Sequence, residues 1–240
     1  MIRSYIPISV ASAFGFQCVN FLFNYDLPLI PSPVGKFADK ERYRWRNAGT
    51  ALVSDFIISG IVIYCLYSQP GLWSDPVRHY AVSVEVCFAV LSGFYMHETY
   101  DLLTHNPLFK DWLLVFHHGI VISTFFMMSI EHIAMGILTI NLLNEVNAIF
   151  LHSRKLLLMH GVSKHSFSYG VHVLLNLGTF FVLRLIPLAF AVYHSFTQPM
   201  PYYLEIVMPC MTTGVAIVDV LQLWSLIRSD LLSKARDGKD

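Results

Sequence analysis

Charged residues are scarce in this chain of 240 residues. Only 13% of them are Asp, Glu, Lys or Arg, against about a quarter in an average soluble domain. The 16 basic residues equal the 16 acidic ones, so the net charge is zero and offers no long-range attraction for nucleic acid. With 55% hydrophobic residues and a mean hydropathy of +0.55, the composition is that of a membrane protein.

The sequence is also poor in the motifs of common catalytic and metal sites. It has no His-x-x-x-His or His-Glu-x-x-His pattern, no Gly-rich phosphate loop and no serine nucleophile elbow, so we expect no bound metal. Its four cysteines lie in apolar runs without metal-ligand spacing, and we expect them to be small core side chains: Cys18, Cys65, Cys87 and Cys210.

Apolar runs long enough to cross a bilayer are the main feature that is present. A helix needs about 20 apolar residues to span a hydrocarbon core of about 30 Å. Seven runs meet that length: Ile6–Phe23, Ala48–Tyr67, Ala81–Thr99, Trp112–Ile130, Ile133–Leu151, Gly170–Phe196 and Tyr203–Ile227. These runs are unbroken and do not alternate in polarity, which favours helices over the strands of a barrel. The predicted fold is an all-α, multipass membrane helical bundle with short loops and no separate soluble domain.

The basic residues predict how the bundle is oriented. If the N-terminus lies on the outer side of the membrane, only Arg3 and Arg78 fall on that outer side. The cytosolic side then receives Lys36, Lys40, Arg42, Arg44, Arg46, Lys110, Arg154, Lys155, Lys164, Arg228, Lys234, Arg236 and Lys239. Cytosolic loops are enriched in Lys and Arg, so we expect the N-terminus outside and the C-terminus, with a tail at residues 233–240, in the cytosol.

The first apolar run allows two interpretations. Arg3 precedes an apolar stretch with small residues, which is also the pattern of a cleaved signal peptide. Cleavage would leave the basic cluster between Lys36 and Arg46 outside, against the charge rule, and no convincing small-residue site follows Phe23. We therefore expect residues 1–30 to form a retained N-terminal transmembrane helix.

Polar residues interrupt the apolar runs at regular positions. An ionisable side chain within a span costs about 2.5–3.5 kcal/mol on insertion scales, so each should face a partner or a hydrated cavity. His97 and Asp101 are four residues apart and share one helix face, as do Asp219 and Gln222. One continuous helical stripe is predicted for the fifth run: Asn141, Asn144, Glu145, Ala148 and His152.

These polar groups are expected to meet at one depth. Counted along their spans, five polar residues all fall in the cytosolic halves: Asp55, His97, Glu145, Asn176 and Asp219. Arg184 lies near the middle of its span, where we expect it to neutralise an acid such as Glu145 or Asp219. Asn176, Ser54 and Gln222 fit the alternative role of hydrogen-bonding neighbouring helices together.

The adjacent pair His117 and His118 is the main candidate for chemistry. Neighbouring helical residues diverge by about 100°, so at most one of the two can point into a central cavity. A neutral imidazole beside Glu145 or Asp219 could act as a general base or an acyl-accepting nucleophile. Alternatively, both histidines have a structural role: one faces lipid headgroups or a neighbouring carbonyl, and the other packs within the bundle.

Several segments, in order along the chain, resemble the TLC domain. They are Asp-Trp-Leu-Leu-Val-Phe-His-His-Gly-Ile-Val-Ile at 111–122, Gly-Phe-Tyr-Met-His-Glu-Thr-Tyr-Asp at 93–101 and Glu-Val-Asn-Ala-Ile-Phe-Leu at 145–151. Four shorter segments are most similar to the TLC domain-containing proteins of types one and two: Tyr43 to Asn47, Ser59 to Ile61, Arg184 to Pro187 and Arg228 to Asp230. The resemblance extends over residues 42–232.

The resemblance implies a six-helix TLC bundle around a lipid-accessible cavity, with the first run as an added helix. Ceramide synthases share this domain and transfer acyl groups with paired histidines and two aspartates. By that likeness His117, His118 and Glu145 would be catalytic if the chain is an enzyme, with acyl-CoA as cofactor; otherwise no cofactor is implied. Ala148 stands where those enzymes place their second acid and cannot take a proton, which counts against acyl transfer.

Proteins of types one and two are associated with restraining the incorporation of long polyunsaturated acyl chains into phospholipids, and so with membrane fluidity. The resemblance therefore implies a regulator of phospholipid composition with a phospholipid or acyl-chain ligand, in the plasma membrane or alternatively the endoplasmic reticulum. No protein partner is implied. A lipid transporter with helix breakers at Gly178 and Pro187 is a third possibility. The predicted lipid-cavity residues are His97, Asp101, Asn141, Asn144, Arg184 and Asp219.

Overall fold

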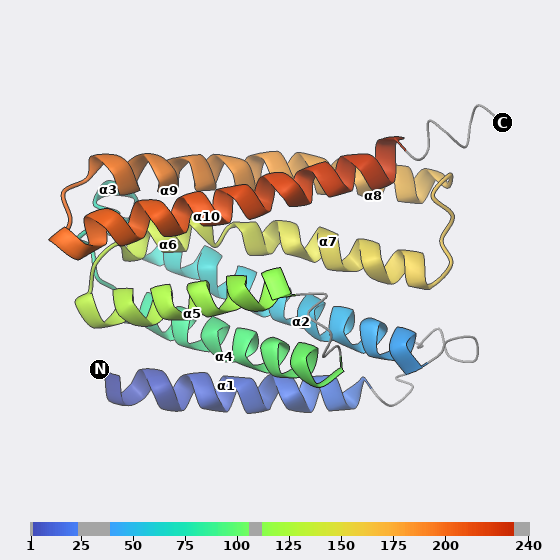
Figure 1. Cartoon of the computed structure of the whole chain (residues 1–240), viewed down its shortest axis with the longest axis horizontal. Coiled ribbons are helices and arrows are strands. Elements are labelled where there is room, and N and C mark those ends of the chain that lie inside the picture. Colours follow the sequence, from blue (N-terminus) through green and yellow to red (C-terminus); the bar gives the residue numbers. More distant parts are fainter. Residues whose placement is uncertain (1, 24–38, 106–111, 233–240) are drawn as a thin grey trace.

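The computed structural model describes residues 2–23, 39–105 and 112–232, and these fold into helices with no β-strand among them (Figure 1). The α-helices are α1 (Ile2–Leu22), α2 (Asp39–Ser68), α3 (Gly71–Ser74), α4 (Val82–His105), α5 (Trp112–Glu131), α6 (Met135–Asn141), α7 (Asn144–Met159), α8 (Phe167–Phe180), α9 (Ile186–Thr197) and α10 (Tyr202–Ile227). Two π-helical segments are η1 (Phe181–Leu185) and η2 (Arg228–Leu232). The predicted all-α bundle is confirmed.

Five helical segments of the described chain are long and apolar enough to cross a membrane: Ser4–Leu22, Arg42–Ser68, Leu114–Glu131, Phe167–Thr197 and Tyr202–Asp230. They match five of the seven predicted spans. The third predicted span is α4, whose polar content is higher because it carries Glu85, Glu98 and Asp101. The orientation of the bundle stays a prediction, and the expected tail at 233–240 lies outside the described residues.

The fifth predicted span is two helices, so the prediction of one continuous helix there is wrong. α6 ends at Asn141 and α7 begins at Asn144. At the joint, the amides of Leu143, Glu145 and Val146 donate to carbonyls only three residues back. This tighter winding interrupts the predicted helix between Asn141 and Asn144.

The sixth predicted span is one continuous helical segment with a π-helical turn in its middle. α8, η1 and α9 follow one another directly from Phe167 to Thr197. Pro187, at the start of α9, has no amide hydrogen, and its ring would clash with the carbonyl four residues earlier in an ordinary α-helix. The π-helical turn just before it contains Arg184, which is buried.

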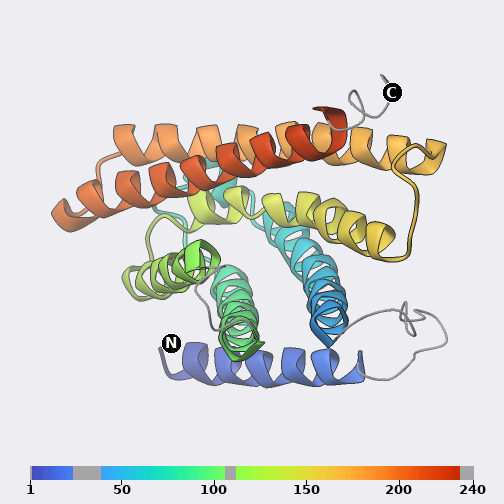
Figure 2. The same ribbon diagram turned by 45° about the vertical axis from the view of Figure 1, so that its right-hand side comes forward.

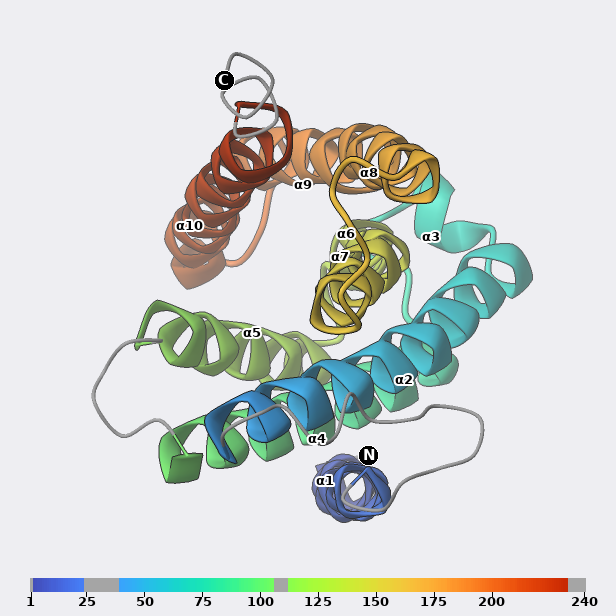
Figure 3. The same cartoon turned by 90° about the vertical axis from the view of Figure 1, so that its right-hand side faces the viewer.

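The helices form layers around α6 and α7. α2 packs on α4 and α7, α7 packs on α8, and α6 packs on α9. α1 forms one outer side and the α8–α10 group the opposite one (Figure 2). Seen along the bundle, α6 and α7 lie between the layer of α2 and α4 and the layer of α8 to α10 (Figure 3).

Large apolar side chains cover much of the outer surface, as expected for helices that face lipid. Phe14 is 69% exposed and Leu174 is 72% exposed. The cysteine prediction is only half right, because Cys65 and Cys87 are buried but Cys18 and Cys210 are exposed. The sequence showed that all four lie in apolar runs, but not which face of each helix is covered.

α1 and α4 run parallel and meet closely at Gly93. A side-chain carbon added at Gly93 would collide with the backbone oxygen of Ser9, the side chain of Ser12 and the backbone nitrogen of Ala13. The Tyr5 hydroxyl lies 2.8 Å from the Ser92 hydroxyl in the same contact. The first apolar run is thus a helix packed on the bundle, and whether it is retained in the mature protein stays a prediction.

Gly93→Ala is expected to lower the free energy of unfolding by about 1–3 kcal/mol, because the methyl group meets α1 backbone that has no room to yield. Gly60→Ala on α2 is the matched control, since an added carbon there meets nothing within 4 Å. A helical alanine should leave that variant equal to or more stable than the wild type. Thermal unfolding of the two purified proteins in detergent measures both, and equal midpoints would contradict the close contact.

Candidate functional site

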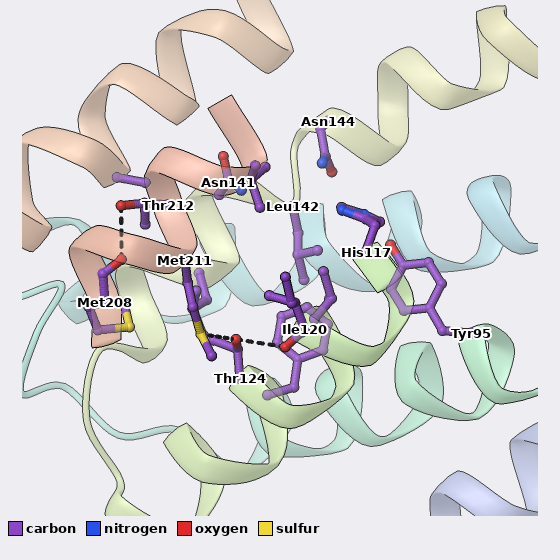
Figure 4. Close-up of a pocket in the computed structure, with 15 residues that line it drawn as sticks. Tyr95, His117, Ile120, Thr124, Asn141, Leu142, Asn144, Met208, Met211 and Thr212 are labelled. Carbon is purple, nitrogen blue, oxygen red and sulfur yellow. Dashed lines mark hydrogen bonds between the residues drawn. The ribbon is translucent and has the colours of Figure 1, made fainter. Parts of the chain in front are cut away.

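A pocket lies where α5 and α10 face the joint between α6 and α7 (Figure 4). It holds about 60 Å³ of space open to a water-sized molecule, and about 610 Å³ when all unoccupied space out to its mouth is counted. Its walls are mainly apolar, with Ile120, Phe125, Leu138, Met208 and Val215 among them. A polar end is formed by Tyr95, His117, Asn141 and Asn144.

His117 is the histidine that reaches this pocket. Its ring meets Tyr95 edge-on at 6.4 Å between centroids. Within the described part of the chain no hydrogen bond or ion pair holds the His117 ring. His117 therefore presents its ring nitrogens to the pocket without a carboxylate to fix their tautomer.

His118 is turned away from the pocket and is only 1% exposed. Its Nε2 lies 3.3 Å from the Glu98 carboxylate and its Nδ1 lies 3.0 Å from the Thr99 hydroxyl. Tyr95 stacks on its ring at 4.8 Å. The divergence expected for adjacent helical residues is confirmed.

Glu98 is the acid beside the histidine pair, and the sequence reasoning did not select it. Glu145 and Asp219 were expected there, yet Glu145 instead accepts a hydrogen bond from the Tyr95 hydroxyl at 3.2 Å. The available signal was that Glu98 follows His97 directly, in a segment already singled out. A residue one position along the helix faces about 100° away, which takes Glu98 toward α5.

A second histidine–acid pair joins α7 to α2. His152 Nδ1 on α7 lies 2.6 Å from the Asp55 carboxylate on α2. Asp55 is 1% exposed, so this contact satisfies a carboxylate that has left water. Asp55 and His152 join two helices and take no part in the pocket lining.

Arg184 pairs with Asp219, which confirms one of the two expected partners. Its Nη1 donates to the Asp219 carboxylate at 3.0 Å and to the Gln222 amide oxygen at 2.7 Å. The shared face predicted for Asp219 and Gln222 is seen in this common contact. Asn176 acts as predicted for a helix-joining residue, since Asn147 donates to its backbone and side-chain oxygens at 3.0 and 3.2 Å.

The six predicted lipid-cavity residues separate into three places. Asn141 and Asn144 line the pocket, whereas Arg184 and Asp219 pair between η1 and α10. His97 and Asp101 face α1, where they meet Gln17 and Asn20. Their role in lipid binding stays a prediction.

The polar side chains of the pocket can therefore form hydrogen bonds with an uncharged group of a ligand whose apolar part lies along the pocket walls. Among the residues that the structure describes, no three His, Cys, Asp or Glu side chains are placed to hold a metal ion. Amide, phenol and imidazole groups can bind the ester or amide linkage of a lipid, while the apolar walls accept hydrocarbon.

Comparisons with known proteins agree with the resemblance of the sequence motifs. A family model described as the TLC domain matches residues 44–228. TLC domain-containing protein 2 of Danio rerio is 27% identical over 223 residues, covering 90% of this chain and 87% of that protein. The Mus musculus protein of the same name is 28% identical, covering 85% and 64%, and TLC domain-containing protein 1 of Gallus gallus is 29% identical, covering 60% and 57%. The chain thus spans less than two thirds of the mouse and chicken relatives. Because the model match takes in most of the chain, this protein belongs to the TLC domain family.

Proposed function

We propose that this protein regulates the acyl composition of membrane phospholipids and limits the incorporation of long-chain polyunsaturated acyl chains. The observation that carries the proposal is the pocket between α5 and α10, which is apolar along its walls and polar at one end. Membrane helices and membership of the TLC domain family support a role in membrane lipid biology. The ligand is a phospholipid or one of its acyl chains.

The lining of the pocket suits a hydrocarbon chain of variable shape. Met208 and Met211 of α10 contribute flexible thioether side chains, which adapt to irregular apolar groups. Asn141 and Asn144 lie toward the polar end, where they can hydrogen-bond the linkage from which an acyl chain extends. A kinked polyunsaturated chain and a straight one would fill such a pocket differently, which gives a physical basis for selection.

The ligand would enter from the bilayer between α5 and α10. These two helices meet at the pocket where the Thr124 hydroxyl contacts the Met211 sulfur. Separation of α5 from α10 at this contact would enlarge the enclosed space toward the lipid-facing surface. The open space of about 60 Å³ is smaller than an acyl chain needs, so such a movement is part of the proposal.

The arrangement of the histidines supports binding over catalysis. A general base or nucleophile needs a reachable reacting atom and a group that orients it. His117 reaches the pocket but has no carboxylate partner in the described chain, whereas His118 has Glu98 but is buried outside the pocket. Ala148 in place of the second acid removes a further proton-carrying group.

An acyltransferase of the ceramide-synthase type is the alternative, and the His118–Glu98 contact of 3.3 Å is the observation that favours it. Glu98 and the Thr99 hydroxyl would orient His118, and acyl-CoA would be the donor. Catalysis would then require His118 to turn toward the pocket.

Substitution of both histidines separates the two functions. In cells lacking the protein and fed a polyunsaturated fatty acid, His117→Gln/His118→Gln is expected to restore the phospholipid acyl profile as wild type does. Glutamine keeps hydrogen-bonding capacity beside Glu98 but does not titrate near neutral pH. Phospholipid mass spectrometry at equal protein levels is the readout. A double variant that is folded and fails to restore the profile would favour the acyltransferase.

The proposal places the protein in the plasma membrane as a multipass protein, with the endoplasmic reticulum as the alternative. The N-terminus is expected outside and the C-terminus in the cytosol, because basic residues concentrate on the side so assigned.

A further inference from the structure

We propose that a second site, the groove between α1 and α4, binds a membrane sterol through its hydroxyl group. This α1–α4 groove has walls formed by Val10 and Phe14 of α1 and by Met96 and Tyr100 of α4. Its open space of about 440 Å³ lies within the range of roughly 300–1,000 Å³ typical of small-molecule sites. α1 and α4 lie side by side along the outer edge of the bundle, away from the α5–α10 pocket (Figure 1).

A polar pair, formed by the buried His97 and the exposed Gln17, gives this apolar groove its anchor. His97 is 4% exposed, and its Nδ1 lies 3.0 Å from the side-chain oxygen of Gln17 across the helix contact. The other ring nitrogen of His97, Nε2, is buried and has no hydrogen-bond partner among the described residues. Nε2 has almost no surface open to the groove, so binding includes a small turn of the exposed Gln17 side chain that lets a ligand hydroxyl reach it. A buried polar atom without a partner costs free energy, so a ligand group that satisfies it gains affinity.

The hydrogen-bonding pattern of this pair matches a hydroxyl group. If His97 donates from Nδ1 to the Gln17 oxygen, then Nε2 is left as an acceptor and the Gln17 amide nitrogen as a donor. If the Gln17 amide is turned around, Nε2 becomes the donor and the Gln17 oxygen the acceptor. Either way the pair offers one donor and one acceptor, which a single hydroxyl complements. A carboxylate or phosphate only accepts, and would leave the acceptor unsatisfied.

The charges around the anchor also favour a neutral lipid. Asp101, one helical turn after His97, contacts Arg46 at 3.5 Å and His105 at 3.3 Å. Arg46 is therefore already engaged by an acid, and the pair brings no net positive charge to the groove. Among the described residues that line the groove there is no Lys or Arg to pair with an anionic headgroup.

The depth and shape of the groove fit a rigid ring system. Gln17 lies five residues before the end of α1, or about 8 Å along the helix, and Val10 lies about 10 Å deeper. A ligand hydroxyl at Gln17 would thus lie near one membrane face, with the apolar body toward the bilayer centre. Ala13, Phe14 and Tyr100 all line the groove, so the flat rings of a ligand would meet two aromatic side chains beside a small one. A fused-ring lipid also loses less conformational entropy on binding than a lipid with two acyl chains.

The site lies where the added helix meets the TLC domain. α1 ends at Leu22, before the family match begins at residue 44, so half of the groove comes from outside the matched domain. The α1–α4 groove shares no lining residue with the α5–α10 pocket. Sterol binding in the groove can therefore be tested independently of the proposed function of the pocket.

The test is photocrosslinking of the full chain in phospholipid nanodiscs with a diazirine-bearing sterol. Labelled peptides are expected from α1 and α4. An unlabelled sterol should compete about three- to tenfold better than its methyl ether, since the ether cannot donate the hydroxyl hydrogen. Sterol should also compete better than diacylglycerol, which has the hydroxyl but not the rings.

Two variants test the site from different directions. Gln17→Leu is expected to remove the preference for sterol over its methyl ether, and Ala13→Trp to reduce labelling at least about fivefold by filling the groove. Leu174→Trp, on the exposed face of α8, is the matched control and should label as wild type does. Gln17 is exposed, so a change of its side chain is expected to leave the fold intact, and this variant keeps the test valid if Ala13→Trp does not fold.

Three results would overturn the proposal. They are labelling that falls mainly outside α1 and α4, equal competition by the methyl ether or by diacylglycerol, and labelling of folded Gln17→Leu that keeps the wild-type preference. Equal competition by diacylglycerol would mean that the groove holds neutral lipids without selecting a sterol.

Discussion

Arg184→Met is expected to lower the free energy of unfolding by about 3–5 kcal/mol. Arg184 and Asp219 are both nearly buried, with side chains 10% and 6% exposed, and their contact of 3.0 Å neutralises two charges in the interior of a membrane protein. Removal of the guanidinium leaves the Asp219 carboxylate and the Gln222 oxygen without their shared donor. The loss is large because an unpaired charge remains buried, and not because the ion pair itself contributes that much.

The double variant Arg184→Met/Asp219→Leu distinguishes these two causes. With both charges gone, apolar side chains fill the space and most of the lost stability should return. Arg228→Met at an exposed position is the control and should change the free energy of unfolding by less than about 0.5 kcal/mol. Denaturation in detergent measures all of the variants. A double variant as unstable as the single one would show that Arg184 does not act through Asp219.

Val215→Trp is expected to abolish lipid binding in the α5–α10 pocket. Val215 lines the pocket from α10, so an indole at this position fills the space that an acyl chain would occupy. We expect phospholipid that copurifies with the protein to fall by at least about tenfold, measured by native mass spectrometry. The same variant should fail to restore the phospholipid acyl profile of cells that lack the protein.

Ile217→Trp provides a matched control for this substitution. Ile217 is two residues away on the same helix, is 58% exposed and does not line the pocket. It carries the same added bulk into the lipid-facing surface and should retain both bound phospholipid and rescue. Thermal unfolding of the two variants checks that the larger side chain has not destabilised α10. If Val215→Trp and Ile217→Trp retained the same amount of bound phospholipid, lipid binding in the α5–α10 pocket would be contradicted.

The helices and several pairings could be predicted because they depend on spacing within one segment. Apolar run length determines where a helix can cross a membrane, and the three-residue spacing of Asp219 and Gln222 places them on one face. The same geometry predicted that His117 and His118 would diverge. A charge near mid-span requires a partner, which made Glu145 or Asp219 the expected partner of Arg184, and the structure shows Asp219.

The remaining features depend on contacts between segments, which spacing within one helix does not specify. His97 and Asp101 share a face, as expected, but that face meets α1 rather than the pocket. Glu98 was missed because only the packing of α4 on α5 brings it to His118. The break between α6 and α7 carries no Pro or Gly signal, since Leu142 and Leu143 form the joint.

The proposed function is tested most simply by the phospholipid acyl profile of cells that lack the protein and are fed a long-chain polyunsaturated fatty acid. We expect more polyunsaturated phospholipid in these cells than in the parent cells, and a return to the parental profile when the wild-type chain is restored. An unchanged phospholipid profile in the cells without the protein would contradict it.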